Sequence, residues 1–314
     1  MFSRLLPIFL AVVVSSAVAP AAADEFSGER AMHWLRYQCD LGPRTPGSPG
    51  IAELRGTILS LADSLGLHRA ELCFDRPDPY SDETMRLCNL VVSAGPRDSK
   101  HLWLGAHYDT RPMCDLDPDP EKAALPLTGA NDAGSGTAVL MHLMELLAAD
   151  PPDRGVDLIF FDGEDYGRAG DLDGFCLGSR HLAERRGDFG NPLAEGEVEG
   201  LIVLDMIGER NVRVPIEQYS LRYARALTEA VFARAAEIGV TALEPVVGPA
   251  VFDDHVPFLQ QGVPALDLID FDYPEWHTSR DTPDRCSAES LEQIGRLVLD
   301  LIRNPLDPGA GSVR

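Results

Sequence analysis

The segment that most constrains the fold is residues 156–165, in which an apolar run passes directly into an acidic turn. Residues 156–161 are rich in β-branched and aromatic side chains and predict a buried strand. The turn that follows carries Asp162, Glu164 and Asp165. Ligands of open α/β sheets bind beyond the carboxyl ends of strands, so this turn predicts a site in which one carboxylate binds a cation and its neighbour acts as a general base. The alternative is a solvated acidic turn.

Apolar segments of strand length alternate along the chain with segments of helical periodicity. The predicted strands are residues 70–74, 87–93, 101–106, 156–161, 201–205 and 264–269. The predicted helices are residues 27–37, 51–66, 129–149, 179–186, 220–239, 255–261 and 287–303. This alternation predicts an α/β fold with a central mixed, mostly parallel sheet that is flanked by helices on both faces. Because no repeat or Pro/Ser-rich linker divides the chain, we expect one catalytic domain over residues 24–304, followed by a flexible tail at 305–314.

The N-terminus predicts a signal peptide over residues 1–23. Arg4 precedes an apolar run at residues 5–18 that is too short to span a bilayer, and small residues end at Ala23. Cleavage after Ala23 would export the protein to the periplasm or out of the cell. An uncleaved N-terminal anchor is the alternative.

Charge and cysteine usage restrict the partners and the redox setting. The net charge of −23 argues against nucleic acid or an anionic membrane as a partner. Export permits disulfides among the six cysteines, and we expect Cys73–Cys88 first, because these residues flank a loop between predicted strands. Cys114–Cys176 is the second expected pair. No C-x-x-C motif is present, which disfavours a cysteine zinc site.

Side chains that bind metals recur where the predicted strands and their following loops end. They are His107, Asp132, Asp165, Asp205 and His277. If one carboxylate bridges, this set of nitrogen and oxygen ligands suffices for two zinc ions about 3.5–4 Å apart. Taken singly, each has a structural alternative: a histidine that only forms hydrogen bonds, a helix N-cap for Asp132, or a turn former for Asp205. Independent accidents would scatter such residues, and their shared position favours a metal site.

The order of the motifs along the chain and the residues within them resemble those of the co-catalytic zinc aminopeptidases and the related glutaminyl-peptide cyclotransferases. The motifs that carry the resemblance are His107-Tyr108-Asp109, residues 129–136, residues 161–165, residues 204–208 and Trp276-His277-Thr278. Residues 253–264 and residues 42–48 favour the cyclotransferase branch, and residues 178–182 also match. The resemblance spans nearly all of the chain after the predicted signal peptide.

The resemblance implies a zinc ion held by Asp132, Asp165 and His277. In the aminopeptidases, His107 and Asp205 would complete a second metal site, with Asp132 bridging. In the cyclotransferases one zinc is usual, and Asp205 joins a hydrogen-bond network with Asp254. Glu164 would be the general acid/base in either branch.

The reaction implied first is conversion of an N-terminal glutamine of a peptide to pyroglutamate, with release of ammonia. Zinc would polarise the γ-carbonyl, Glu164 would move the proton, Asp205 and Asp254 would hold the amide group, and Trp276 would form a pocket wall. The alternative is an aminopeptidase with two metals. A binding protein on an inactive scaffold would have lost Glu164 or a ligand, and none is lost. We expect peptide or protein N-termini as substrates and a monomeric protein.

The chain departs from the cyclotransferase pattern at three places. Asp165 stands where a glutamate is frequent, and its shorter side chain still coordinates. Tyr166 follows where the animal enzymes soon place a substrate-holding tryptophan, so substrate preference is open and Tyr166 becomes the substrate-binding candidate. Ala106 and Thr137 stand near the positions of a cysteine pair that those enzymes have.

Overall fold

The computed structural model describes residues 25–188, 193 and 197–306, so the predicted signal peptide and most of the predicted tail lie outside the described residues. Its centre is a six-stranded sheet in the order β1-β2-β4-β3-β5-β8. The strands are β1 (His68–Pro77), β2 (Thr84–Ala94), β3 (Lys100–His107), β4 (Gly155–Phe161), β5 (Glu197–Asp205) and β8 (Ala265–Ile269). The β1/β2 and β2/β4 pairs are antiparallel, whereas β4, β3, β5 and β8 run parallel. The predicted mixed, mostly parallel sheet is confirmed.

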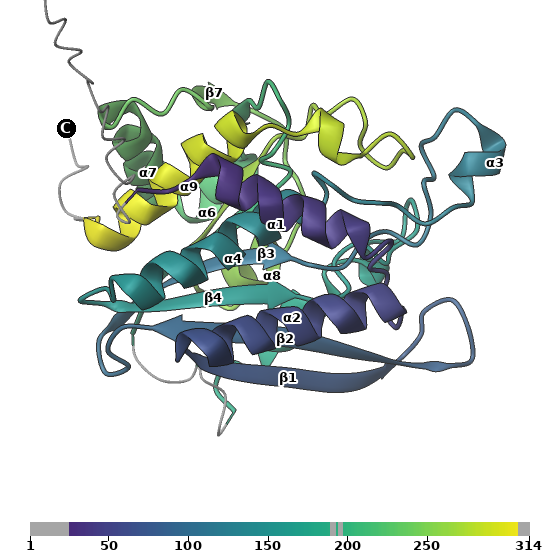
Figure 1. Ribbon diagram of the computed structural model, residues 1–314, viewed down its shortest axis with the longest axis horizontal. Coiled ribbons are helices and arrows are strands. Elements are labelled where there is room, and N and C mark those ends of the chain that lie inside the picture. The colour runs from purple at the N-terminus through teal and green to yellow at the C-terminus, as the bar shows by residue number, and fades with distance from the viewer. Residues whose placement is uncertain (1–24, 189–192, 194–196, 307–314) are drawn as a thin grey trace, which may run out of the picture.

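Helices cover both faces of this sheet, as predicted (Figure 1). On one face, α2 (Pro49–Leu65) and α4 (Gly134–Ala149) pack against the strands, and α1 (Gly28–Asp40) and α9 (Ala288–Arg303) pack against α4 in the same hydrophobic core. The other face packs against α5 (Leu177–Glu184) and α8 (His255–Gln260). Side chains of β4 alternate between the two cores: Leu158 and Phe160 face the first, and Ile159 and Phe161 face the second. Burial on both sides explains why this strand is a continuous apolar run.

Two elements differ from the sequence predictions. The helix predicted over residues 220–239 is two helices, α6 (Gln218–Tyr223) and α7 (Arg225–Glu237), because Ala224 leaves the helical conformation at φ −130° and ψ 38°. A separate two-stranded parallel sheet of β6 (Val214–Ile216) and β7 (Leu243–Val247) was not predicted. β6 has three residues, one of them proline, and its partner is distant in sequence, so no local pattern marks it. In addition, the predicted loop of residues 111–128 contains a short helix, α3 (Pro120–Ala123).

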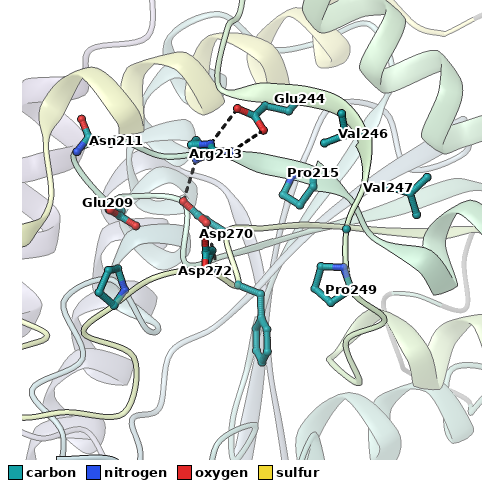
Figure 2. A pocket seen from close by; sticks show the side chains of 13 residues that line it. Glu209, Asn211, Arg213, Pro215, Glu244, Val246, Val247, Pro249, Asp270 and Asp272 are labelled. Carbon is teal, nitrogen blue, oxygen red and sulfur yellow. Dashed lines mark hydrogen bonds and ion pairs between the residues drawn. The ribbon is translucent and has the colours of Figure 1, made fainter.

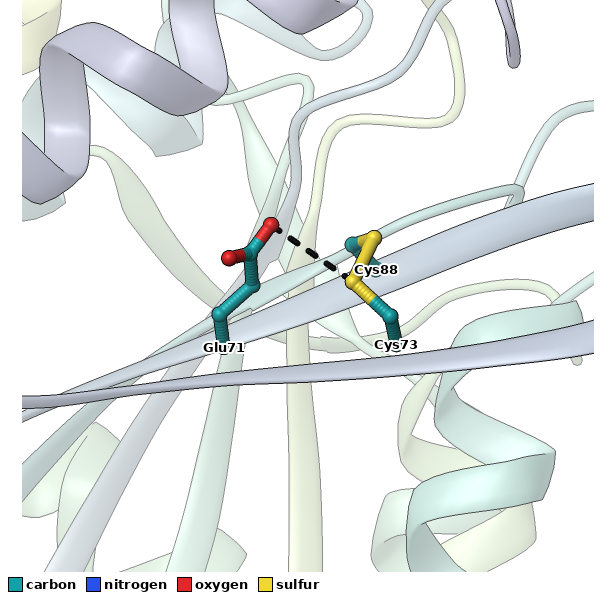
Figure 3. Close-up of side chains that lie close together, drawn as sticks. All are labelled: Glu71, Cys73 and Cys88. Atoms are coloured by element: carbon teal, nitrogen blue, oxygen red, sulfur yellow. Dashed lines mark hydrogen bonds between the residues drawn. A yellow bond between two sulfur atoms is a disulfide. The ribbon is translucent and has the colours of Figure 1, made fainter.

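The disulfide prediction is half right. Cys73 and Cys88 face each other across the β1/β2 pair and form a disulfide, with the Glu71 carboxylate beside it (Figure 3). The predicted Cys114–Cys176 pair is wrong, because both thiols are free and the Cys176 thiol is directed at Glu164 instead. Among the described residues, no helix is long and apolar enough to cross a bilayer.

Candidate metal centre and catalytic cavity

The carboxyl ends of the parallel strands bring the predicted metal ligands together. His107 is the last residue of β3 and Asp205 the last residue of β5, while Asp165 follows β4. Asp132 lies in the loop that enters α4, and His277 lies in the loop after β8. Neighbouring parallel strands end at the same edge of a sheet, which explains how residues so far apart in sequence share one site.

The five ligand candidates form two groups of three that share Asp132. His107 Nε2 lies 3.3 Å from Asp132 Oδ1 and 3.2 Å from Asp205 Oδ1. His277 Nε2 lies 3.7 Å from Asp132 Oδ2 and 3.5 Å from Asp165 Oδ1. All five side chains are buried. The structure therefore brings all five predicted residues together around Asp132.

Two further buried carboxylates fix the loops that carry these ligands. Asp109 accepts hydrogen bonds from the backbone N–H groups of Glu164 (3.0 Å) and Asp165 (3.3 Å). Asp281 accepts from the backbone N–H groups of Asn131 (2.9 Å) and Asp132 (3.2 Å). Asp109 stood out in the His-x-Asp motif, whereas Asp281 carried no sequence signal beyond its closeness to His277.

Arg111 joins the environments of two ligands. Its guanidinium donates to Asp165 Oδ1 at 2.7 Å and makes a bidentate pair with Asp115 at 2.7 and 2.8 Å. Asp115 in turn lies 3.3 Å from Nδ1 of His277, which leaves Nε2 facing Asp132 and Asp165. Such outer carboxylates orient a histidine ligand and favour one tautomer. Sequence reasoning missed both Arg111 and Asp115, because they open a long loop whose path no local pattern determines.

The donor set fits a bound zinc ion. Histidine nitrogen and carboxylate oxygen are ligands that zinc prefers, and Asp165 Oδ2 is buried without a hydrogen-bond partner among the described residues. Burial raises the pKa of Asp165 to about 6 and that of Asp205 to about 7, and neighbouring acids add to both shifts. Crowded buried carboxylates of this kind are stabilised by a cation placed between them.

A cavity of about 220 Å³ opens onto the metal ligands and Glu164. Its apolar wall consists of Leu172, Phe175, Met206, Val251, Phe252, Ile269, Phe271 and Trp276. The Trp276 ring lies 4.0 Å from the His277 imidazole and 4.8 Å from the Phe271 ring, so the predicted wall residue does line the cavity. Tyr166 does not line it: its hydroxyl donates to Asp78 Oδ2 at 3.0 Å, in the loop between β1 and β2. The space suits a single terminal residue rather than a long ligand.

Glu164 is accompanied in this cavity by Asp253. These two residues and Cys176 place ligand atoms within 4.8 Å of one another, and Asp253 lines the cavity. Burial raises the pKa of Glu164 well above its usual value, and the negative charge of Asp253 contributes to the shift. Asp254, the residue named by the sequence prediction, is fully buried but is not part of the cavity lining. The residue that lines the cavity beside Glu164 is therefore Asp253, which directly precedes the predicted Asp254.

The Cys176 thiol donates to Glu164 Oε1 at 3.3 Å. Cys176 adopts a left-handed backbone conformation (φ 54°) immediately before α5, and its backbone N–H donates to the Glu164 carbonyl at 2.8 Å. Cys176 therefore contacts both the side chain and the main chain of Glu164.

Glu217 anchors the segment that carries Asp253. It is buried at the start of α6 and accepts from the backbone N–H groups of Tyr219 (2.8 Å), Ser220 (2.6 Å) and Val251 (3.0 Å). Its carboxylate also lies 3.1 Å from His255 Nε2. One carboxylate therefore ties α6, residue 251 and α8 together, although in the sequence it is an ordinary glutamate before a helix.

The Glu217 contacts predict a pH-dependent contribution to stability. Burial opposes ionisation, but His255 and the backbone donors outweigh it and lower the pKa of Glu217 to about 2. Because this value is below that of an unfolded glutamate, the contribution is present above about pH 4.5 and is lost as the pH falls toward 2. We expect Glu217→Gln to lower the free energy of unfolding near neutral pH by about 2–3 kcal/mol.

Urea unfolding of both proteins between pH 2 and pH 6, with a chelator present, measures this difference. The two curves should converge toward pH 2, because protonated glutamate and glutamine are similar in shape and charge. Glu229→Gln, which changes an exposed residue of α7, is the control and should show no such convergence. A Glu217→Gln deficit that stays constant with pH would contradict the assignment.

Known proteins resemble this chain over most of its length. A crystal structure of a Zn-dependent exopeptidase from Parabacteroides distasonis is 31% identical, with a TM-score of 0.84, and the match covers 90% of this chain and 100% of that one. The crystal structure of Porphyromonas gingivalis glutaminyl cyclase is 30% identical, with a TM-score of 0.82 and coverage of 88% and 97%. The glutaminyl-peptide cyclotransferase of Boiga dendrophila is 28% identical over 308 residues, which cover 87% of this chain and 81% of that protein.

The model of "Peptidase family M28" matches residues 89–302. This range is more than half of the chain and contains every residue of the two ligand groups as well as Glu164 and Asp253. Both the extent of the match and the residues within it lead to one conclusion: the chain belongs to peptidase family M28.

Proposed function

We propose that this protein is a zinc-dependent glutaminyl-peptide cyclotransferase, which converts an N-terminal glutamine to pyroglutamate and releases ammonia. The observation that carries the proposal is the pairing of the half-buried Glu164 with the buried Asp253 in a cavity of about 220 Å³ with aromatic walls. Cyclisation expels the side-chain amide nitrogen as ammonia, and a second acid beside Glu164 can bind that nitrogen as it leaves. Asp253 Oδ2 is buried without a hydrogen-bond partner among the described residues and is available for that purpose.

Family membership implies zinc, and Asp132, Asp165 and His277 are the residues that would hold it. Bound zinc supplies polarisation of the substrate's γ-carbonyl group. Arg111 contacts Asp165 and Asp115 contacts His277, so neighbouring side chains position two of the three ligands. One zinc is proposed for this reaction.

Glu164 accounts for the proton balance of the reaction. The α-amino nitrogen forms a bond to the side-chain amide carbon, and the bond from that carbon to the amide nitrogen breaks. The attacking amine loses one proton to Glu164, and the departing nitrogen gains one and leaves as ammonia. A raised pKa suits a carboxyl group that must both accept and donate, and the contact from Cys176 keeps it in position. Asp205 and Asp253 would bind the amide group, while Trp276 and Phe271 enclose the side chain.

A zinc aminopeptidase is the second candidate. It is favoured by one observation: His107 and Asp205 are present beside Asp132 and complete the second metal position. In that case Glu164 would deprotonate a water molecule that attacks the first peptide bond, and two metals would be required. Crystal structures similar to this chain include both a Zn-dependent exopeptidase and a glutaminyl cyclase.

A paired assay separates the two reactions. The purified protein, loaded with zinc, is incubated with a Gln-initiated and a Leu-initiated peptide, and the products are followed by mass. We expect the Gln peptide to lose the mass of ammonia and the Leu peptide to stay intact. Loss of the first residue from either peptide would replace the proposal with the aminopeptidase, and no change in either would exclude both activities on these substrates.

We also infer that the protein is exported, acts on peptide N-termini and works as a monomer. The Cys73–Cys88 disulfide supports export, because disulfides persist in oxidising compartments. The cavity supports the substrate class, since it admits one terminal residue.

A further inference from the structure

A second, larger pocket of about 510 Å³ lies next to the catalytic cavity. It is built from the β6–β7 sheet and from the segments that follow β5 and β8. In Figure 2, Glu209, Asp270 and Asp272 lie on one side, while Pro215, Val246, Val247 and Pro249 lie on the other. Apart from Phe271, none of the residues assigned above to substrate binding, proton transfer or metal binding lines this pocket, which we call the acidic groove.

The acidic groove continues from the catalytic cavity along two segments of the chain. Residues 246–249 line the groove, and the residues that directly follow, 250–253, line the cavity. On the β8 side, Phe271 lines both. A peptide whose first residue occupies the cavity therefore has the groove as a neighbouring path for the residues that follow.

The charge of the groove is negative and only partly compensated. Among the described residues that line it, Arg213 is the one cation, and its guanidinium is already bound by Glu244 at 2.9 and 3.3 Å. Asp270 accepts from the backbone N–H of Arg213 at 2.8 Å, which supplies no positive charge. Burial, with the nearby Asp270, raises the pKa of Glu209 to about 7, as expected of a carboxyl group that faces other acids rather than a cation.

The opposite wall offers apolar contact and a free strand edge. Val246 and Val247 are 55% and 59% exposed, which is high for β-branched residues in a strand. Within the described part of the chain, β7 pairs only with β6, so its other edge has unpaired backbone groups. Exposed strand edges bind extended peptides through main-chain hydrogen bonds.

We propose that the acidic groove binds the residues that follow the N-terminal glutamine of a peptide substrate and selects a lysine or arginine among them. The groove meets the cavity at Phe271 and is negative where a basic side chain would lie. This inference rests on the proposed cyclotransferase function, and it adds a preference for basic peptide N-termini that the catalytic cavity alone cannot give.

A set of seven peptides tests this preference. The parent is Gln followed by alanines, and in the others a single Lys or a single Glu occupies position 2, 3 or 4. Ammonia release gives kcat and KM for each peptide at low salt. We expect a KM about two- to fivefold lower for Lys than for Glu at one or more of these positions, and the difference should shrink at about 0.5 M salt.

Two double variants identify the groove as the source of the preference. Glu209→Gln/Asp272→Asn removes two groove charges and should remove most of the Lys-over-Glu difference in KM. Glu53→Gln/Asp98→Asn removes two exposed charges of the same types on α2 and before β3, and it should leave the difference intact. Circular dichroism and zinc content of each variant check that folding is unchanged.

Each outcome has a distinct meaning. Equal KM values for the Lys and Glu peptides, with ammonia released from all of them, would overturn the proposed selectivity of the acidic groove but not the proposed cyclotransferase function. A Lys-over-Glu preference that persists in Glu209→Gln/Asp272→Asn and decreases in the control variant would also overturn the proposed role of the acidic groove. No ammonia from any peptide would overturn the proposed function and the groove with it.

Discussion

Replacement of Glu164 by glutamine is expected to lower kcat by about 100- to 10,000-fold, which is the usual contribution of a general acid or base. Glutamine has nearly the same shape but cannot exchange a proton with the substrate amine. Glu164 belongs to neither ligand group of the metal centre, so the variant should keep its zinc. Ammonia release from a Gln-initiated peptide and elemental analysis of the same preparation measure both properties.

The matched control is Glu121→Gln, an exposed glutamate of α3 in the loop that follows Arg111. It makes the same chemical change outside the cavity lining, and its activity should equal that of the wild type. If Glu164→Gln retained most of its turnover, the assignment of Glu164 as acid/base would be wrong. If the variant were inactive but also free of zinc, the loss would not identify a proton-transfer role.

Replacement of His277 by alanine is expected to release the zinc ion. The group of Asp132, Asp165 and His277 contributes a single nitrogen donor, and its removal leaves only two carboxylates, which is fewer than the three protein ligands that catalytic zinc sites use. The measurement is the molar ratio of zinc to protein after dialysis against a weak chelator. Activity should fall in proportion to the zinc lost.

His107→Ala is the informative partner of this variant, because His107 belongs to the other group of three. With one zinc held as proposed, His107→Ala should keep a zinc-to-protein ratio near that of the wild type. Two moles of zinc in the wild type, falling to one in His107→Ala, would favour the two-metal aminopeptidase. Full zinc in dialysed His277→Ala would show that His277 is not a ligand.

The positions of the metal ligands could be predicted because they follow from strand ends. His107, Asp165 and Asp205 come directly after apolar runs, and parallel strands place their carboxyl ends side by side. The mixed sheet and its helices could be predicted because a strand or helix that is buried on one face has apolar residues at a regular spacing in the sequence. The small β6–β7 sheet has no such repeat, and its residues line the acidic groove.

The supporting residues depend on packing between distant segments. Asp281, Arg111 and Glu217 act through hydrogen bonds to segments that are far away in sequence. No spacing rule connects a donor in one loop with an acceptor in another, so their partners are known only once the chain is folded.

By itself, the sequence determined the fold class and the set of side chains available for metal binding and proton transfer, and it predicted the Cys73–Cys88 pair. Those properties depend on residue type and on local period, which a sequence records directly. Tertiary structure alone decided that Asp253 rather than Asp254 faces Glu164, that Tyr166 turns away toward Asp78, and that Cys176 contacts Glu164 instead of Cys114. The direction of a side chain in a turn changes with every residue, and it is set by the packing of the neighbouring elements.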